Sequence, residues 1–432
     1  MELDQLTASV LDRLTAAGAD EAYCEASESE TREFNVENGS FSLFRTLFDK
    51  GLTLTAYQDH KKGQVHANRF DDEAVAAAVS DCMAVAAAGE ADEAWRLAPE
   101  AVEQDFTLGV PEPDMDLFFS RLQELLAGIA AQYPTIGVES MVALHRKSTI
   151  VYRNTNGACF RTLEGNFQVE LEYVAHDGDL GSSVFYSVLT LDKLDRPLIE
   201  LGSVKSDLDM VVRQVHTTPL EGKFVGTVLL PPACLRDFLS SALDNFAGDN
   251  VILNGTSIWK DKLGQTVADP RLTLHIAPLD ERIVGGERYT AEGYVSRNYT
   301  ILDKGVLQCF RLSDYVANKT GFSRAANTDS WAYCLEPGDK PLDALIAGIE
   351  RGVLVGRFSG GEPGTNGDFS GVAKNSFLIE HGRITDALSE TMISGNLEVL
   401  LNSLTGLSTE TVCNGFTVLP WAAFDGVTIS GK

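Results

Sequence analysis

The hydrophobic periodicity of the N-terminal segment changes from helical to alternating and back, and this change restricts the chain to a mixed fold. Apolar residues recur at three- and four-residue steps over residues 3–14, which places them on one face of a helix. Over residues 21–69 apolar and polar residues alternate instead, as they do in half-buried strands. A second helical pattern covers residues 72–88. This order of elements predicts an α+β unit in which flanking helices cover one face of an antiparallel sheet.

Short glycine-containing motifs predict where the strands reverse direction. A glycine that follows a short polar residue favours a tight hairpin, because such turns need positive φ angles. The predicted turns are Asn38-Gly39, Lys50-Gly51, Asp303-Lys304-Gly305, His381-Gly382, Asn414-Gly415 and Asp425-Gly426. Most of them lie beyond residue 300, which predicts a β-rich C-terminal region.

The length of 432 residues exceeds what one hydrophobic core usually supports, so two or three domains are expected. Residues 1–97 are predicted to form an N-terminal α+β domain, and the acidic, proline-containing residues 98–113 a linker. Residues 114–218 are predicted to be a central α+β segment packed with the N-terminal domain. Residues 219–432 are predicted to form a β-rich domain with a few helices, one of which begins at Pro231-Pro232 and runs to about Phe246. The fold class is therefore α+β.

The charge balance argues against direct contact with nucleic acid or with an anionic membrane. The chain has 62 acidic and 35 basic residues, which gives a net charge of −27. Binding to a phosphate backbone depends on clustered Lys and Arg, and a surface this acidic repels it. The apolar runs are also too short to span a bilayer.

The cysteines and the N-terminal residues indicate a cytoplasmic protein. Seven cysteines are scattered along the chain without a C-x-x-C pair, which excludes the usual zinc-ribbon and thioredoxin-like motifs. Scattered free thiols are typical of a reducing compartment. The first residues lack the basic and apolar segments of a signal peptide.

A search for catalytic motifs finds none. None of the seven histidines is followed by Glu, and G-x-S-x-G, Walker and G-x-G-x-x-G motifs are absent. The glycine-dense residues 359–371 have two interpretations, a flexible surface loop or a peptide-binding or anion-binding groove lined by backbone amides. The residues that would line such a groove are Gly361, Gly364, Gly367, Ser370 and Gly371.

Several segments, in this order along the chain, resemble the TldD/PmbA family, whose label is modulator of DNA gyrase. They are Gly18-Ala19-Asp20-Glu21-Ala22, Val36-Glu37-Asn38-Gly39, Gly255-Thr256-Ser257, Phe369-Ser370-Gly371 and Ser394-Gly395-Asn396-Leu397. The resemblance extends over almost the whole chain and implies the α+β architecture of that family.

The active subunits of this family carry H-E-x-x-x-H on the helix before the Gly-Thr-Ser element, with a late Cys completing the metal site. At the matching positions this chain has Ser240, Ser241 and Asn245, and Cys413 lies near the late Cys. A serine hydroxyl is a poor zinc ligand and cannot replace the carboxylate base. The resemblance therefore implies no catalytic residue, no metal and no cofactor in this chain. Cys413 is expected to be a small buried apolar residue.

By this resemblance the chain is a PmbA/TldE-type, non-catalytic subunit of a heterodimeric zinc metallopeptidase. Its expected partner is a TldD-like subunit that carries the zinc, and its expected substrates are unstructured peptides held in an enclosed cavity. Two alternatives stay open, a stand-alone homodimeric peptide-binding protein and a regulator of DNA gyrase acting through protein contacts. A third is hydrolysis at an unrecognised site that uses Ser240, Ser241 or Cys413.

Overall fold

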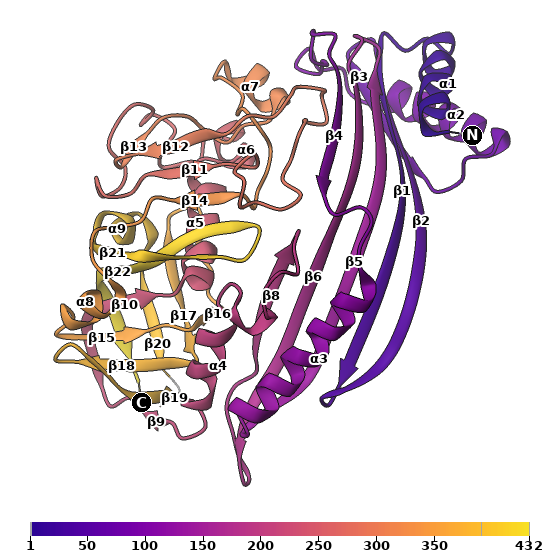
Figure 1. Cartoon of the computed structure of the whole chain (residues 1–432). Helices are drawn as coiled ribbons and strands as arrows, with labels where there is room; N and C mark the ends of the chain where they lie inside the picture. Colours follow the sequence, from indigo (N-terminus) through magenta and orange to yellow (C-terminus); the bar gives the residue numbers. More distant parts are fainter. Residues whose placement is uncertain (1, 390, 432) are drawn as a thin grey trace.

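The computed structural model describes residues 2–389 and 391–431, which form two halves built on separate sheets. Figure 1 shows the first half as a layer of long, curved strands beside the more irregular second half. The α+β class predicted from the sequence is confirmed. All seven cysteines are free thiols. None of the helices in the described ranges combines the length and the apolar composition needed to cross a bilayer.

The first half is an eight-stranded sheet with the order β3-β2-β1-β5-β6-β4, in which β7 and β8 also pair with β6. All its pairs are antiparallel except β4 with β6. Its strands are β1 (Glu21–Glu37), β2 (Ser40–Gln58), β3 (Lys61–Ala67), β4 (Glu103–Gly109), β5 (Ile136–Asn154), β6 (Cys159–Asp177), β7 (Leu180–Gly181) and β8 (Phe185–Leu191). Its helices are α1 (Leu3–Ala16), α2 (Asp72–Ala88) and α3 (Met115–Gln132).

The helices of the first half cover one face of this sheet. Met141 and Val151 of β5 point to the same side of the strand, because their positions differ by an even number of residues. Met141 packs in the buried cluster of α3, and Val151 packs in the cluster of α1 and α2. On the opposite face, Phe160 of β6 stacks on Tyr289 of the second half, with ring centroids 4.6 Å apart.

The turns of the first half agree with the sequence at one predicted position and differ at another. Asn38 and Gly39 have φ angles of 49° and 73° and close the β1–β2 hairpin, as predicted. The predicted turn at Lys50-Gly51 is wrong, because β2 continues through it and Gly51 pairs with Ser27. The chain turns instead at Asp59-His60, where both φ angles are positive.

The stretch 98–113, predicted as a linker, contributes strand β4 to the sheet edge. Most of its side chains are exposed, so the strand lacks the apolar alternation by which strands are recognised. The central segment 114–218 adds β5 to β8 to the sheet of residues 1–97.

The second half is a fourteen-stranded mixed sheet with the central order β13-β12-β11-β14-β22-β10-β15-β18-β19-β9. Three of its pairs are parallel, β10 with β15, β14 with β22, and β19 with β9. Its strands are β9 (Thr218–Pro219), β10 (Lys223–Leu230), β11 (Leu274–Ile276), β12 (Tyr299–Asp303), β13 (Val306–Leu307), β14 (Tyr333–Leu335), β15 (Arg351–Leu354), β16 (Arg357–Ser359), β17 (Asp368–Lys374), β18 (Ser376–Glu380), β19 (Arg383–Ser389), β20 (Met392–Asn396), β21 (Leu404–Cys413) and β22 (Thr417–Ser430).

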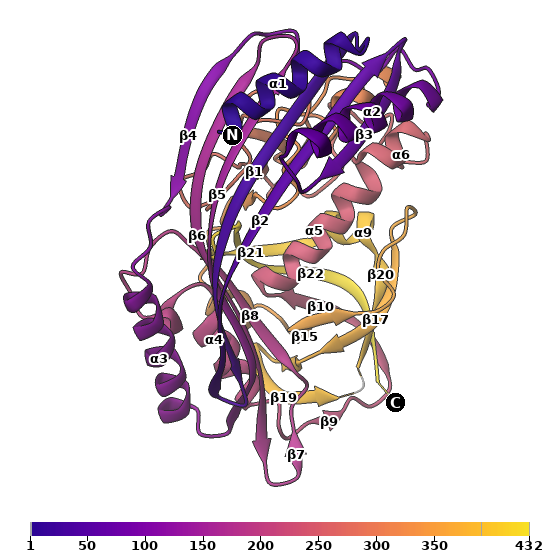
Figure 2. The same ribbon diagram turned by 90° about the vertical axis from the view of Figure 1, so that its right-hand side faces the viewer.

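Helix α5 forms the centre of the second half. Its helices are α5 (Pro232–Phe246), α6 (Asp249–Leu253), α7 (Asp314–Thr320), α8 (Leu342–Ala347) and α9 (Leu397–Asn402), whereas η1 (Leu198–Glu200) and α4 (Val204–Val212) pack in the buried cluster of the first half, together with α3. Prolines are tolerated in the first turn of α5 because those amides have no partner within the helix. Its apolar side packs in the largest buried cluster of the chain, and Figure 2 shows it beside β22 and β10.

The predicted turns of the second half agree with the structure except at its C-terminal end. Lys304-Gly305, His381-Gly382 and Asn414-Gly415 each lie between paired strands, as predicted. The turn predicted at Asp425-Gly426 is wrong, because β22 runs through it. Gly426 has a φ of 78° and belongs to a bulge opposite β10, which explains why this dipeptide resembles a turn signal.

Candidate functional site

The motif positions on α5 face a groove. Ser240 and Ser241 are half-buried, and Asp237 and Asp244 precede and follow them at helical spacing on the same side of the helix. Together with the β16–β17 hairpin these residues enclose a hollow of about 260 Å³. We call this hollow the α5 groove; its walls are Asp237, Phe238, Ser240, Ser241, Asp244, Phe358, Glu362 and Pro363.

Asn245 fastens the glycine-rich loop to α5. Its side-chain amide donates hydrogen bonds to the carbonyl oxygens of Ser241 and Pro363, each at 2.9 Å. The structure thereby brings together two features that are distant in the sequence, the altered metal motif and the glycine-rich residues. The side-chain nitrogen of Asn245 therefore holds the loop in place, and this side chain has a structural role.

The glycine-rich residues build a hairpin beside the groove. Gly361 has a φ of 59°, and a Cβ there would lie 1.6 Å from the carbonyl oxygen of Ser370, so only glycine fits. The amides of Gly364, Gly367 and Ser370 donate to carbonyl oxygens within the same hairpin. Ser370 and Gly371 themselves belong to β17. The loop therefore lines the groove with the residues Glu362 and Pro363. Its amides at Gly364, Gly367 and Ser370 are already bonded within the hairpin and are not free to bind a ligand.

Strand β16 presents a free edge at the groove. It pairs with β17 on one side, and no strand pairs with its other side within residues 2–389 and 391–431. Phe358 in the middle of β16 lines the groove. An extended peptide can pair with such an edge through main-chain hydrogen bonds, whatever its side chains.

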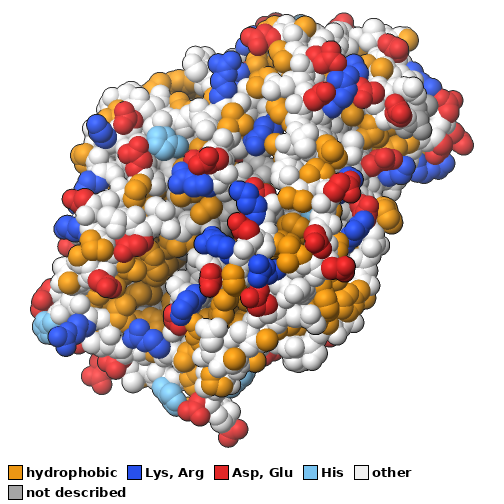
Figure 3. Space-filling model, in the orientation of Figure 1, with side chains coloured by type: hydrophobic (Ala, Val, Ile, Leu, Met, Phe, Trp, Pro, Cys, Tyr) orange, Lys and Arg blue, Asp and Glu red, His pale blue; other side chains and the backbone are white. Residues whose placement is uncertain are grey.

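The groove continues past β16 into an apolar pocket. A smaller hollow, lined by Arg236, Asp237 and Phe358, joins the groove to the vicinity of Asp207 on α4. Beyond it lies a pocket of about 250 Å³ with apolar walls that include Met210, Leu354, Phe377 and Trp421. Figure 3 shows hydrophobic side chains gathered in a hollow on the face of the second half, with charged side chains around it.

The donor groups of the groove do not fit a catalytic zinc ion. The motif positions supply two hydroxyls and one amide, whereas zinc prefers imidazole, thiolate and carboxylate ligands. Asp237 pairs with Arg236 at 2.7 Å, and Asp244 pairs with Arg311. In the part of the chain that the structure describes, no three His, Cys, Asp or Glu side chains are grouped so as to hold a metal ion.

Cys413 is not among the residues that line the groove. It ends β21, where its thiol donates to the carbonyl oxygen of Arg282 at 3.4 Å and packs near Cys334 and Val418. Burial raises the pKa of the Cys413 thiol above its ordinary value and that of Cys334 to about 12. Both therefore remain protonated at neutral pH, so neither is a reactive thiolate.

The serine alternative lacks a base of the usual kind. A serine nucleophile needs an adjacent general base, most often histidine. No histidine is among the described residues that line the groove and its extension. The groove carboxylates Asp237, Asp244 and Glu362 were not singled out from the sequence. The first two share helical spacing with Ser240 and Ser241, a signal that could have placed them on one face.

Comparison with known proteins gives one consistent group of relatives. A family model described as the PmbA/TldA metallopeptidase C-terminal domain matches residues 222–431. A protein named metalloprotease from Methanothermobacter thermautotrophicus is 26% identical over 320 residues, which cover 69% of this chain and 68% of the relative. A metalloprotease PmbA homolog from Haemophilus influenzae is 23% identical over 431 residues, which cover 93% of this chain and 90% of the relative.

The fold matches a solved structure over its full length. The crystal structure of TldE from Thermococcus kodakarensis superimposes with a TM-score of 0.84. The match covers 99% of this chain and 100% of that chain at 19% sequence identity. At this identity the likeness establishes the fold and its arrangement of two halves.

Proposed function

Because this chain belongs to the TldD/PmbA family, we propose that it is a non-catalytic subunit of a heterodimeric zinc metallopeptidase acting on unstructured peptides. In this proposal a TldD-like partner supplies the zinc and this chain presents the peptide. The observation that carries the proposal is the α5 groove, which keeps a hollow at the motif positions while Ser240, Ser241 and Asn245 replace the expected ligands. Zinc bound by the partner would polarise the scissile carbonyl and activate water.

The shape of the groove supports a role in peptide presentation. The free edge of β16 offers main-chain hydrogen bonds to an extended chain, and Glu362 adds a negative charge to the wall. The apolar pocket next to it would accept a hydrophobic side chain. A groove of this shape admits an extended segment more readily than a folded domain, which supports the proposed preference for unstructured peptides.

An apolar stripe on β2 supports the proposal of a partner subunit. Leu43, Phe44, Leu47 and Phe48 are 40%, 55%, 38% and 75% exposed, and we call them the β2 stripe. They lie on residues 40–51, where β3 no longer pairs with β2, so this length of strand is an open sheet edge within the described chain. Long apolar edges are normally covered, because they invite pairing with other chains. A second subunit that covers this edge would remove the liability.

We propose a cytoplasmic location for the complex, which the seven free thiols support because thiols stay reduced in that compartment. The homodimeric alternative would cover the same β2 stripe with a second copy of this chain. The gyrase alternative would require a protein contact with gyrase itself, given the net charge of −27.

Filling the α5 groove tests the presentation role. Ser241→Trp and, from the loop, Glu362→Trp should raise the KM of the reconstituted complex for an unstructured casein peptide by about tenfold, since tryptophan occupies the hollow. The zinc content of the partner should not change. Ser330→Trp, at an exposed position outside the groove walls, is the matched control. An unchanged KM in both folded groove variants would contradict the proposal.

A further inference from the structure

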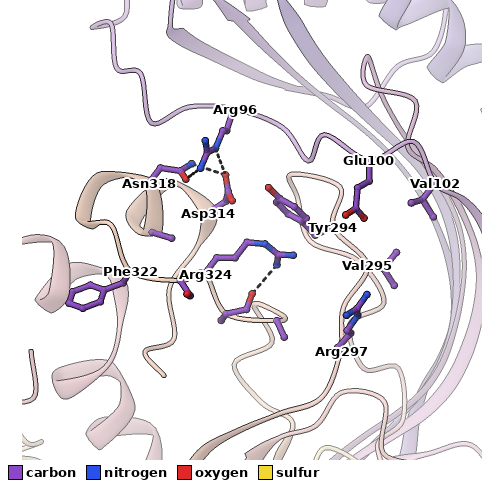
Figure 4. A pocket seen from close by; sticks show the side chains of 14 residues that line it. Arg96, Glu100, Val102, Tyr294, Val295, Arg297, Asp314, Asn318, Phe322 and Arg324 are labelled. Atoms are coloured by element: carbon purple, nitrogen blue, oxygen red, sulfur yellow. Dashed lines mark hydrogen bonds and ion pairs between the residues drawn. The ribbon is translucent and has the colours of Figure 1, made fainter. Parts of the chain in front are cut away.

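A second hollow of about 740 Å³ lies between the two halves, away from the α5 groove. Its walls come from the segment that follows α2 and from two segments of the second half, and they include Arg96, Glu100, Tyr294, Arg297, Asp314 and Arg324. Figure 4 shows these side chains projecting from separate segments around a common space. The volume falls within the range of about 300–1,000 Å³ that is typical of small-ligand sites. We call it the arginine pocket.

One of its three arginines is already neutralised. Arg96 lies 3.6 Å from the carboxylate of Asp314 and also donates to the side-chain oxygen of Asn318. Asp314 is 5% exposed and accepts a further hydrogen bond from Asn318 at 2.9 Å. This network forms one side of the pocket, and the charges of Arg96 and Asp314 cancel on that side.

The other two arginines lack a carboxylate partner in the described ranges. Arg324 stacks on the ring of Tyr294, with its guanidinium carbon 3.5 Å from the ring centroid, and donates to the carbonyl oxygen of Ala325 at 2.9 Å. Arg297 is exposed, and its backbone is held by Ala326 and by the fully buried Asn327. Stacking on Tyr294 fixes the guanidinium of Arg324, the backbone bonds hold Arg297 at the pocket wall, and most N–H donors of both side chains are unused among the described residues. In a chain of net charge −27, two such cations in one hollow indicate a site for an anionic group.

Glu100 adds a negative charge to the wall of the arginine pocket. It is exposed on the segment that follows α2 and forms no ion pair among the described residues, so its carboxylate can accept a cation. A ligand that satisfies both Glu100 and the two arginines carries a cationic and an anionic group, such as the ammonium and the carboxylate of a zwitterion. A free amino acid is small for this hollow, whereas a short peptide with free termini has both charges at a suitable size.

We infer that the arginine pocket binds a short peptide with free termini, its carboxylate on Arg297 and Arg324 and its ammonium toward Glu100. The choice of a peptide among zwitterionic ligands rests on the proposed function, because hydrolysis of unstructured peptides releases such fragments. The binding itself requires neither the partner subunit nor zinc, so it can be measured on this chain alone.

Calorimetric titration of the purified chain with trialanine tests this inference. Trialanine should bind, while its C-terminal amide and its N-acetyl form should each bind at least about tenfold more weakly, because each loses one charge. Arg297→Gln and Arg324→Gln should weaken trialanine binding by a similar factor and should have little further effect on the amide. Glu100→Gln should likewise weaken the binding of trialanine and should have little further effect on the N-acetyl form. Arg383→Gln, at an exposed arginine on β19 for which the described residues provide no ion pair, is the matched control and should bind normally.

Three results would overturn the inference. They are no binding of trialanine at millimolar concentration, equal binding of the capped peptides, and inorganic phosphate binding as tightly as trialanine. A failure here leaves the groove-filling kinetics of the complex unaffected, so the two proposals fail separately.

Discussion

The two halves of the molecule differ in what they leave exposed. The first half is built from long hairpins between neighbouring segments, and its sheet ends in the open, apolar edge of β2. The second half joins distant segments into a mixed sheet around α5; it holds the α5 groove and lines the arginine pocket together with the segment that follows α2. An open edge suits contact with another protein, whereas a hollow suits a ligand. The comparison teaches that the open edge and the hollows occupy different parts of the chain, so the proposed contacts with a partner and with a peptide can be tested by separate variants.

The largest expected effect is the loss of stability when a buried aromatic side chain of the second half is deleted, compared with an exposed one of the first half. Phe246 of α5 is fully buried, with its ring centroid 5.1 Å from that of Trp259. Phe246→Ala should lower the free energy of unfolding by about 3–5 kcal/mol, because it leaves a cavity in the second half. The same deletion at the 75% exposed Phe48 should change it by less than about 0.5 kcal/mol. Urea unfolding of both variants makes the measurement, and equal losses would contradict the assignment of Phe48 to an uncovered surface.

A charge on the β2 stripe should break assembly without affecting stability. Phe48→Asp should raise the dissociation constant of the complex with a TldD-like partner by at least tenfold, because a buried carboxylate without a partner is costly. Val85→Asp on α2, at an apolar side chain that is 47% exposed, is the matched control. Analytical ultracentrifugation measures the dissociation constants. If both variants assemble as well as the wild type, the partner docks elsewhere.

The junction between the halves should give the chain a pH-dependent stability. Asp207 of α4 lines the hollows between the halves and accepts hydrogen bonds from Ser187 and Ser203, each at 2.7 Å. Burial raises its pKa from 3.8 to about 7, although these hydrogen bonds lower it. Between pH 4 and 7 the folded chain therefore keeps a proton that the unfolded chain has lost, so the free energy of unfolding falls as the pH rises through this window.

Asp207→Asn should remove this dependence. The variant should be more stable than the wild type at pH 8 by roughly 1–3 kcal/mol, and the difference should close near pH 4. Asp195→Asn, at an exposed position, provides the control. Thermal unfolding across the pH range tests this, and parallel curves for the two variants would show that Asp207 is not the responsible group.

The smallest expected effect concerns the loop of the second half. Asn245→Ala removes the hydrogen bonds to Ser241 and Pro363 and should cost about 0.5–1.5 kcal/mol. Hydrogen exchange of the amides in residues 360–367 should become faster, because the loop loses its attachment to α5. Asn254→Ala is a suitable control, since that side chain bonds only within its own helix end. Unchanged exchange in the loop would mean that the hairpin holds its position without Asn245.

The same contrast explains how much of the fold could be predicted from the sequence. Local signals succeeded where a turn or helix is set by neighbouring residues, as at Asn38-Gly39 and at the helix that begins with Pro232. They failed at Lys50-Gly51, where β2 keeps extended backbone through a glycine, and at β4, whose exposed side chains give no apolar alternation. The conformation of these two segments is determined by pairing with strands that are distant in the sequence, and no short sequence motif indicates that pairing.

The candidate site was predictable only in parts. The altered motif at Ser240, Ser241 and Asn245 was found through the family resemblance, by its distance from Gly255-Thr256-Ser257. Its contact with the glycine-rich loop depends on Asn245 and Pro363, which are separated by 118 residues. The arginine pocket gave no sequence signal either, because Arg297, Arg324 and Glu100 come to line one hollow only through the packing of the two halves.

The measurement that tests the central claim most directly is zinc content and casein-peptide hydrolysis of the purified chain, alone and mixed with its TldD-like relative. The account predicts no zinc and no hydrolysis by the chain alone, and activity on mixing that exceeds that of the relative by itself. Stoichiometric zinc or clear hydrolysis by the chain alone would contradict it, and so would a mixture no more active than the relative.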